Sequence, residues 1–384
     1  MMMEIYLDNS ATTKPYLPVV KLMVYNMKNF FGNPSSLHAK GIMAEKLIKK
    51  AKNQISEVLR CSPNELFFTS GGTESNNLAI QGIVRANRGK HILSTQIEHP
   101  ATLNTLKYLE SIGYEIEVIS VDSDGVVVLE EIENKIKEDT VLVTVMHANN
   151  EIGTIEPILK IAKLIRRINS NTYFHVDACQ SYCKIPFTVD ELGCDLLSIS
   201  SHKIHGPKGV GCLYVRGGTR VSPIIFGGGQ QKDLRPGTEN VVSISAFGLA
   251  SEISGKNMLE SSKKMRNLNN LLRKHILKNI DNVFINTPLK NFVPHILNVS
   301  FKGVKSQVLL NHLDKEFIYV SSGAACSSRK NKPSYVLGSI GLSPDLIESS
   351  IRFSLSVFTT IEEIERTILC LTKLVPKLRR IGEL

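Results

Sequence analysis

Apolar residues follow two alternating patterns along the chain, short β-rich runs and longer stretches with helical spacing. The short runs predict strands at 65–69, 91–95, 115–120, 141–147, 173–176 and 196–200. The stretches between them predict helices at 39–59, 76–85, 101–112, 129–137 and 158–169. This alternation indicates an α/β fold, with a parallel central sheet covered by helices on both faces. Ligands bind beyond the carboxyl ends of such strands, so we expect the chemistry just after each strand.

The pattern changes in the last third of the chain, where longer helices and shorter strands follow. It predicts one or two helices within 245–280, strands at 296–301 and 317–321, and a closing helix at 361–378. A chain of 384 residues is too long for one small core. We therefore expect a large domain formed by 14–255 and a smaller α+β domain formed by 1–13 with 256–384.

The excess of positive charge lies at one end of the chain. The net charge is +10; residues 1–255 hold 26 basic and 26 acidic residues, whereas 256–384 hold 20 and 10. Such a one-sided charge favours an acidic partner, whether a protein, an RNA or a membrane, or is simply a solvated face. Composition leaves both interpretations open.

Other features of the composition indicate a cytoplasmic protein. The hydrophobic content is 42%, no apolar run approaches the roughly 20 residues of a membrane span, and the first residues lack a secretory signal pattern. Seven cysteines, an odd number, occur without a Cys-x-x-Cys pair. A disulfide framework and a zinc site are therefore not expected. We expect reduced thiols, no resident metal and no membrane partner.

Polar residues follow two of the predicted strands in patterns that suit a cofactor. Gly72 and Thr73 lie where a strand turns into a helix, and free backbone N–H groups there suit a phosphate. A plain glycine turn with a threonine N-cap explains them as well. Asp177 stands at a strand end, with Gln180 three residues later. This carboxylate could hold a protonated ring nitrogen of a cofactor, or it could cap the next helix.

A third group of polar residues contains a lysine. Ser200, His202 and Lys203 follow a strand, and a glycine-rich stretch comes after them. The 26 residues from Asp177 to Lys203 fit two adjacent strands, so both side chains could face one crevice. A lysine among polar and cationic groups can have a lowered pKa and form an imine with an aldehyde, although most lysines are surface residues.

Several motifs occur in one order along the chain. They are Tyr6 to Thr13, Gly32 to His38, Glu98-His99-Pro100, His147 to Gly153, Asp177-x-x-Gln180, Ser200-x-His202-Lys203, Gly227 to Gln230, Arg235 to Thr238, and Ser321 to Cys326. Together they resemble the cysteine desulfurases of the NifS/IscS type, which are class V aminotransferase-like enzymes dependent on pyridoxal phosphate. The resemblance runs from residue 5 to about 370. It implies the fold type I of pyridoxal-phosphate transferases, with a mostly parallel central sheet in the large, cofactor-binding domain.

The resemblance also implies a role for each matching residue. Lys203 would be the Schiff-base lysine, and His99 would stack on the cofactor ring and move protons. The other implied cofactor contacts are Gly72, Thr73, Ser200 and His202 at the phosphate, and Asp177 and Gln180 at the ring. Thr238 would complete the phosphate site from a second subunit, which implies a homodimer. Asn149 and Arg352 would bind the substrate carboxylate, a task that suits a fork-shaped guanidinium.

One cysteine has a setting that favours reactivity. Cys326 lies in a small, polar stretch at 321–328, and the basic stretch 329–332 follows it. Nearby cations favour the thiolate, which is the attacking species, although a free cysteine is more often a buried apolar residue. We expect Cys326, carried by a loop of the small domain, to be the nucleophile and at most a transient iron–sulfur contact. Cys179 and Cys183 are interpreted as packing residues.

The expected reaction removes sulfur from L-cysteine and leaves L-alanine and a persulfide on Cys326. The persulfide would pass to an acceptor, either an iron–sulfur scaffold or a tRNA-thiolating enzyme; the segment after Cys326 looks closer to relatives that feed tRNA thiolation. One alternative is an aminotransferase or selenocysteine lyase on the same fold. Another is a basic scaffold that binds RNA or sulfur-assembly proteins without catalysis. Direct binding of nucleic acid is not expected.

Overall fold

A seven-stranded sheet forms the centre of the computed structural model, which describes residues 4–323 and 333–382. In order across the sheet, its strands are β2 (Leu66–Thr69), β8 (Gly211–Val215), β7 (Leu196–Ser200), β6 (Tyr173–Asp177), β5 (Thr140–Met146), β3 (His91–Thr95) and β4 (Glu115–Ile119). Neighbouring strands are parallel except for β8, which is antiparallel to β7 and β2. The predicted α/β class with a mostly parallel sheet is confirmed.

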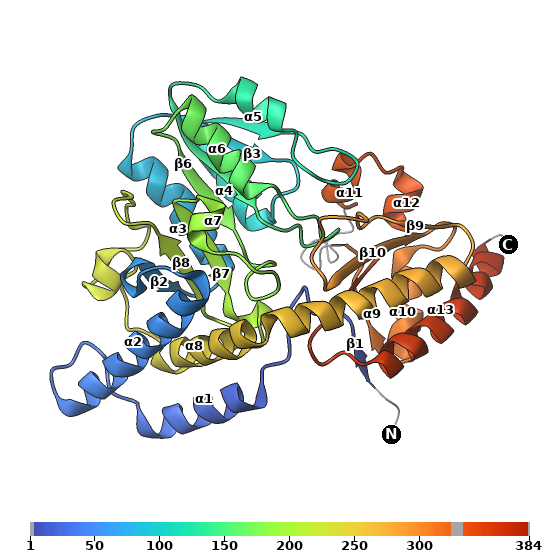
Figure 1. The fold of residues 1–384 in the computed structure, drawn as a ribbon, viewed down its shortest axis with the longest axis horizontal. Helices are drawn as coiled ribbons and strands as arrows, with labels where there is room; N and C mark the ends of the chain where they lie inside the picture. Colours follow the sequence, from blue (N-terminus) through green and yellow to red (C-terminus); the bar gives the residue numbers. More distant parts are fainter. Residues whose placement is uncertain (1–3, 324–332, 383–384) are drawn as a thin grey trace.

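Helices cover both faces of this sheet (Figure 1). One apolar core holds buried residues of α3 (Gly72–Ala86) and α4 (Pro100–Ser111). The other core holds buried residues of α1 (Leu17–Asn29), α2 (Ala39–Leu59), α5 (Leu129–Lys135), α6 (Ile158–Ile168), α7 (Val189–Leu192) and α8 (Val241–Lys256). Every residue of β5 is buried because helices pack on both of its sides, as its unbroken apolar sequence requires.

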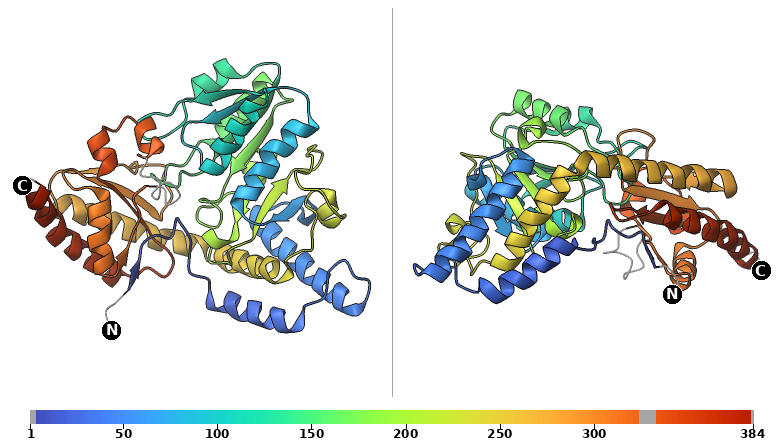
Figure 2. Two further views of the ribbon diagram at one scale, coloured as in Figure 1. Left: turned by 180° about the vertical axis from the view of Figure 1, so that it is seen from behind. Right: turned by 60° about the horizontal axis from the view of Figure 1, so that its bottom comes forward.

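A third apolar core is formed by the last third of the chain together with its first few residues. An antiparallel sheet holds β9 (Val283–Ile285), β10 (Ile296–Phe301) and β12 (Ser350–Ser354). The helices around it are α9 (Met258–Asn279), α10 (Ser306–Lys315), α12 (Pro344–Glu348) and α13 (Ile361–Gly382), whereas the buried residues of α11 (Tyr335–Ser339) belong to the core that also holds α1 and α2. The short strand β1 (Ile5–Tyr6) pairs in parallel with β11 (Ile318–Tyr319), and Figure 2 shows this N-terminal strand against the last third of the chain. The domain division predicted above stays a prediction.

Most of the predicted elements form, with ends shifted by a few residues. The stretch 245–280 is two helices, α8 and α9, separated at Asn257. The prediction missed β1, β8, β9 and β12 as well as α1, α7, α10, α11 and α12. β8 was missed because it begins at Gly211, within the glycine-rich stretch that follows Lys203.

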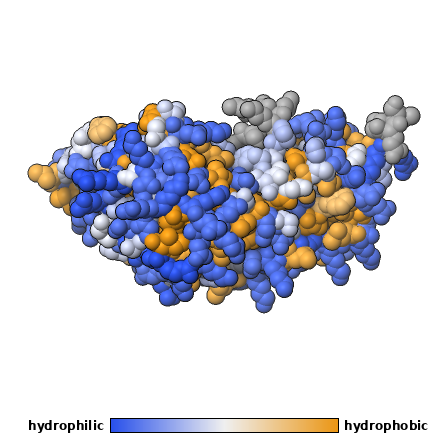
Figure 3. Space-filling model, turned by 90° about the horizontal axis from the view of Figure 1, so that it is seen from above, coloured by the Kyte–Doolittle hydropathy of each residue, from blue (hydrophilic) through white to orange (hydrophobic). Residues whose placement is uncertain are grey.

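None of the helices in the described ranges is both long and apolar enough to cross a bilayer. The face seen from above carries mostly hydrophilic residues with apolar ones between them (Figure 3).

Candidate active site

Asp177 and Lys203 lie at the same edge of the central sheet. Asp177 ends β6, and Lys203 lies in the short 3-10 helix η2 (Ser201–Lys203), which follows β7. Because β6 and β7 are parallel neighbours, their carboxyl ends meet at one edge. Two residues chosen from separate motifs are therefore brought to one place by the fold.

The N-terminal segment holds η2 from the other side. The Lys203 ammonium donates to the backbone carbonyls of Ser10 and Ala11, the latter at 2.9 Å. The Thr13 hydroxyl donates to the carbonyl of His202 at 2.9 Å and accepts from the N–H of His205 at 2.8 Å. Sequence reasoning noted this segment as a motif but assigned it no role, because every residue has a carbonyl and the pattern cannot show which ones are used.

The Asp177 carboxylate is oriented by two donors. The Asn76 amide donates to Oδ2 at 2.7 Å, and the Cys179 N–H donates to Oδ1 at 2.9 Å. Asn76 lies four residues after Gly72 on α3, so both are on the same side of that helix. Sequence reasoning missed Asn76, although this i,i+4 spacing was a usable signal. Gln180, just after this turn, donates to the Ser10 carbonyl at 3.0 Å.

His99 is a neutral imidazole with a defined tautomer. It caps α4, where its Nδ1 accepts the N–H of Ala101 at 3.1 Å, so the proton lies on Nε2. Burial lowers the pKa of His99; the charge of Asp177 acts in the opposite direction, and that of Lys203 lowers the pKa further. The side chain is therefore uncharged at pH 7 and offers one N–H group.

A phosphate-sized anion fits the group formed by Gly72, Thr73, Ser200 and His202. Gly72 and Thr73 open α3, and the first N–H groups of a helix have no acceptor within it. The Ser200 hydroxyl is buried without a hydrogen-bond partner among the described residues, and a β-carbon built on Gly72 would lie 3.7 Å from the Ser200 β-carbon. Burial, with the charge of Lys203, lowers the pKa of His202 to about 3. These residues fit the phosphate of the expected cofactor.

Gly72 is also required by packing. A β-carbon at this position would lie 2.7 Å from the Sγ atom of Cys179, which is shorter than any real contact. Only glycine therefore lets the start of α3 approach the turn that follows Asp177.

Thr238 is the residue that the family resemblance assigns to the phosphate site of a second subunit. It is exposed in the loop between η3 (Gln230–Asp233) and α8. Arg235 fixes this loop to the first turn of α3 through an ion pair with Glu74, 2.7 Å from Nε to Oε1.

Arg352 lies in β12 and is 2% exposed. Its Nη1 donates to the carbonyl of Asn150 at 2.8 Å, and its Nη2 pairs with Oδ1 of Asp8 at 2.9 Å. Its Nε has no hydrogen-bond partner among the described residues. Sequence reasoning gave Asp8 no role, since its partner is 344 positions away.

The Asn149 side chain forms hydrogen bonds with backbone groups of the protein. It is fully buried, its amide donates to the carbonyl of Ile97 at 3.1 Å, and its Oδ1 accepts the N–H groups of Glu151 and Ile152 at 2.8 and 3.0 Å. Its predicted contact with a substrate stays a prediction.

Cys326 lies at 324–332, outside the described residues. The six other cysteines are free thiols. Burial raises the pKa of Cys370 to about 11, that of Cys179 well above its ordinary value, and that of the other four to about 12: Cys61, Cys183, Cys194 and Cys212. None of these six is a thiolate at pH 7.

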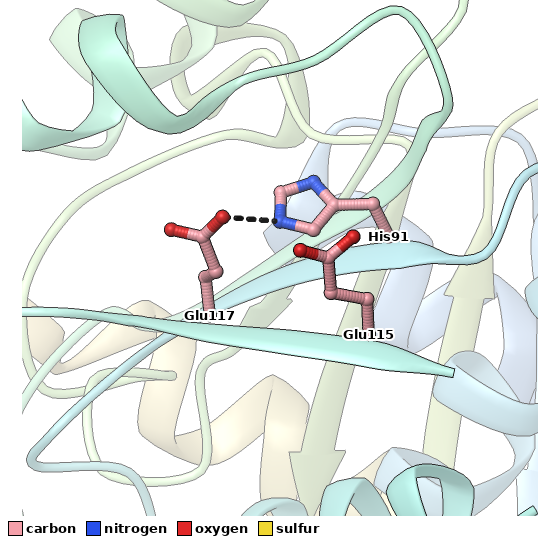
Figure 4. A group of neighbouring side chains, drawn as sticks. All are labelled: His91, Glu115 and Glu117. Carbon is pink, nitrogen blue, oxygen red and sulfur yellow. Dashed lines mark ion pairs between the residues drawn. The ribbon is translucent and has the colours of Figure 1, made fainter. Parts of the chain in front are cut away.

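A cluster of possible metal ligands lies at the opposite edge of the sheet. Ligand atoms of His91, Glu115 and Glu117 lie within 4.8 Å of one another, and Figure 4 shows them on one face of β3 and β4. The Lys137 ammonium, however, lies 2.6 Å from Glu115 and 2.5 Å from Glu117. This cation already pairs with both carboxylates, so we interpret the cluster as an ion-pair network.

Comparison with known proteins agrees with the geometry. Residues 5–367 match the family model described as aminotransferase class-V. The chain is 43% identical to the cysteine desulfurase IscS of Dictyoglomus turgidum, over 99% of this chain and 96% of that one. It is 42% identical to cysteine desulfurase IscS 1 of Archaeoglobus fulgidus, over 99% of each.

Solved structures share the fold over nearly the whole chain. One described as a NifS-like protein superposes with a TM-score of 0.93 at 38% identity, covering 98% of this chain and 100% of that one. Another, described as SspA in complex with cysteine, has a TM-score of 0.82 at 33% identity, covering 93% and 100%.

Proposed function

The chain belongs to the aminotransferase class-V family and, within it, to the cysteine desulfurases that depend on pyridoxal phosphate; from that premise we propose which of its residues carry the reaction. The observation that carries the assignment is the pairing of β6 with β7, which brings Asp177, Ser200 and Lys203 to one edge of the sheet.

Residues of the large sheet would hold the cofactor. When bound, pyridoxal phosphate supplies an aldehyde for Lys203 and a ring that withdraws electrons from the substrate α-carbon. Asp177, oriented by Asn76, would bind the ring N–H, and Gln180 would bind the phenolic oxygen. The start of α3 and the unpartnered Ser200 hydroxyl would bind the phosphate.

The proposed proton transfers use Lys203 and His99. Lys203 Nζ removes the proton from the α-carbon of cysteine, and the carbonyls of Ser10 and Ala11 hold that nitrogen in place. His99 is neutral and offers its Nε2–H from the end of α4. Arg352 binds the substrate carboxylate, which must share or displace Asp8 because Nη2 is paired with that residue.

Cys326 is the proposed sulfur acceptor. The six described cysteines stay protonated because burial raises their pKa values. Arg329 and Lys330 follow Cys326 in the sequence and favour its thiolate. This thiolate attacks the sulfur of cysteine: the S–S bond forms, and the Cβ–S bond breaks with its electron pair left on carbon. One proton is then added to the β-carbon, Lys203 returns the proton that it took from the α-carbon, and alanine leaves while Cys326 holds a persulfide.

Replacing the proposed nucleophile tests this function. In the Cys326→Ser variant we expect sulfide release to fall to background while the cofactor absorbance band remains, with Cys370→Ser as the matched control. Sulfide release by Cys326→Ser at the wild-type rate would overturn the role of Cys326.

The partners follow from the same assignment. We propose a homodimer in which Thr238 reaches the phosphate of the neighbouring subunit; exposed apolar side chains support a second copy, among them Tyr25, Met27, Phe31, Leu37 and Phe226. Light scattering should give twice the monomer mass, and the monomer mass would contradict the homodimer.

We further propose a cytoplasmic enzyme whose acceptor is an iron–sulfur scaffold or a tRNA-thiolating enzyme, docked on the basic last third of the chain.

A further inference from the structure

Glu151 is a buried carboxyl group without a role in the steps above. It is 1% exposed and follows Asn149 in the loop after β5. Burial raises its pKa, while the bond from Ser334 and the charge of Arg352 act in the opposite direction. Its Oε1 has no hydrogen-bond partner among the described residues. Burying a carboxyl oxygen without a hydrogen bond destabilises the fold, so the presence of Glu151 needs a functional explanation.

The other oxygen of Glu151 lies between two residues that are distant from it in sequence. The Ser334 hydroxyl donates to Oε2 at 2.6 Å. A β-carbon built on Gly323 would lie 3.1 Å from the same Oε2 and 3.7 Å from the Ser334 β-carbon. Gly323 also has a φ of +65°, which favours glycine. Gly323 and Ser334 therefore meet at the Glu151 carboxyl group.

Residues close to Gly323 and Ser334 in sequence are bonded beside proposed site residues. Ser321, two residues before Gly323, forms a pair of backbone hydrogen bonds with Arg352 at 2.7 and 3.2 Å. Tyr335, next to Ser334, donates at 2.5 Å to the carbonyl of Glu98, which directly precedes His99 in the sequence. Each end of the stretch 324–332 is thus bonded beside a residue with a proposed catalytic or substrate role.

We propose that Glu151 is a positioning residue for Cys326: its carboxyl group fixes Gly323 and Ser334 together beside Arg352. The inference rests on the proposed role of Cys326 as the sulfur acceptor. Three peptide units separate Gly323 from Cys326, and each spans about 3.8 Å between α-carbons. The position of Gly323 therefore limits the positions that the Cys326 thiol can take relative to the substrate sulfur. A shift of a reacting group by about 1 Å can slow a reaction markedly.

Variants of Glu151 and Ser334 test the proposal in single-turnover reactions. In Glu151→Ala and Ser334→Ala we expect persulfide formation on Cys326 to slow about tenfold, with the cofactor band unchanged. Glu151→Gln keeps an amide oxygen for Ser334 and should stay within about threefold of wild type. The double alanine variant should be no slower than either single one, because both remove the same contact.

Glu156→Ala is the matched control, because Glu156 is another buried carboxyl group with a raised pKa, which accepts the N–H of Val127. It should form the persulfide at the wild-type rate. Wild-type rates in both Glu151→Ala and Ser334→Ala would overturn the proposal. So would equal slowing by Glu151→Gln and Glu151→Ala, or by Glu156→Ala. If Cys326 is not the sulfur acceptor, the result is different: Cys326→Ser still releases sulfide, and every Glu151 variant reacts at the wild-type rate.

Discussion

The proposed cofactor side of the site, with Asp177, Ser200 and Lys203, and the proposed substrate side, with Arg352, are built from different kinds of contact. On the cofactor side, Asp177 and Ser200 end adjacent strands of one sheet, and Lys203 follows within three residues. On the substrate side, Arg352 is held by Asp8 and by the carbonyl of Asn150, which are 344 and 202 positions away. The first side is set by one sheet, and the second by the way separate parts of the chain meet.

This difference predicts separable defects. A change on the cofactor side should alter both cofactor binding and turnover, because the same strand ends serve both. A change on the substrate side should alter the use of cysteine while the cofactor stays bound. The predictions below test that separation, from the largest effect to the smallest.

Replacing Lys203 should have the largest effect. Lys203→Ala removes both the covalent attachment and the proposed base, so we expect turnover to fall roughly a thousandfold. The absorbance band of the cofactor in this variant should shift, or the cofactor should be lost on gel filtration. Turnover is measured in parallel as the rate of alanine formation. Lys208→Ala, an exposed lysine five residues on, is the control. Normal turnover by Lys203→Ala would remove the basis of the cofactor side.

Replacing Arg352 should damage the substrate side alone. Arg352→Lys keeps a charge but loses the fork, and a hydrogen bond to a charged group is worth about 2 kcal/mol. We expect KM for cysteine to rise about 30-fold while the cofactor spectrum is unchanged. Asp8→Asn removes the competing carboxylate and should lower KM or leave it equal. Loss of the cofactor band in Arg352→Lys would show that the two sides are not separable.

Removing the support of Asp177 should weaken cofactor binding moderately. Asn76→Ala deletes the 2.7 Å bond to Oδ2, so we expect cofactor affinity to fall about tenfold. KM for cysteine should stay within a factor of two when cofactor is saturating. Asn77→Ala, on the same helix but bonded to Thr73 and Thr105, is the control and should bind cofactor normally. Equal affinities for the two variants would contradict the role of Asn76.

The cofactor side was predictable from sequence because its signals are local. The strand pattern and the polar residues after each strand placed Asp177 and Lys203 on adjacent strands, which β6 and β7 are. The long runs that form β5 and α6 were also clear, since burial on both faces and amphipathic spacing leave strong patterns. The antiparallel β8 was missed because a glycine-rich turn precedes it.

The substrate side could not be predicted in the same way. Nothing in the sequence near Asp8 points to Arg352, and nothing near Glu151 points to Ser334 or Gly323. These contacts depend on how β12 and the N-terminal segment reach the large sheet. Only the resemblance to a family suggested Arg352, and it gave no role to Asp8 or Glu151.

The smallest expected effect concerns a carboxyl group where the two sides meet. Glu98 is fully buried between β3 and β5; its Oε1 accepts from Thr95 at 2.9 Å and from the N–H of Met146 at 2.7 Å. Burial raises the pKa of Glu98, and likewise that of Glu156, from 4.5 to about 8. Between these values the folded state keeps a proton that the unfolded state releases. The contribution to stability is therefore full below pH 4.5 and is lost as pH rises to about 8.

Glutamine variants should flatten this pH dependence. Because an amide does not titrate, Glu98→Gln and Glu156→Gln should each reduce the fall in Tm between pH 5 and pH 8 by a few degrees, and the double variant by more. Thermal unfolding followed by circular dichroism at both pH values measures this. Identical slopes in wild type and both variants would mean that neither carboxyl group stays protonated in the fold. A smaller fall in Tm together with unchanged turnover in Glu98→Gln would assign a structural role to the Glu98 side chain. The Tyr335 hydrogen bond is kept in this variant, because Tyr335 donates to the backbone carbonyl of Glu98.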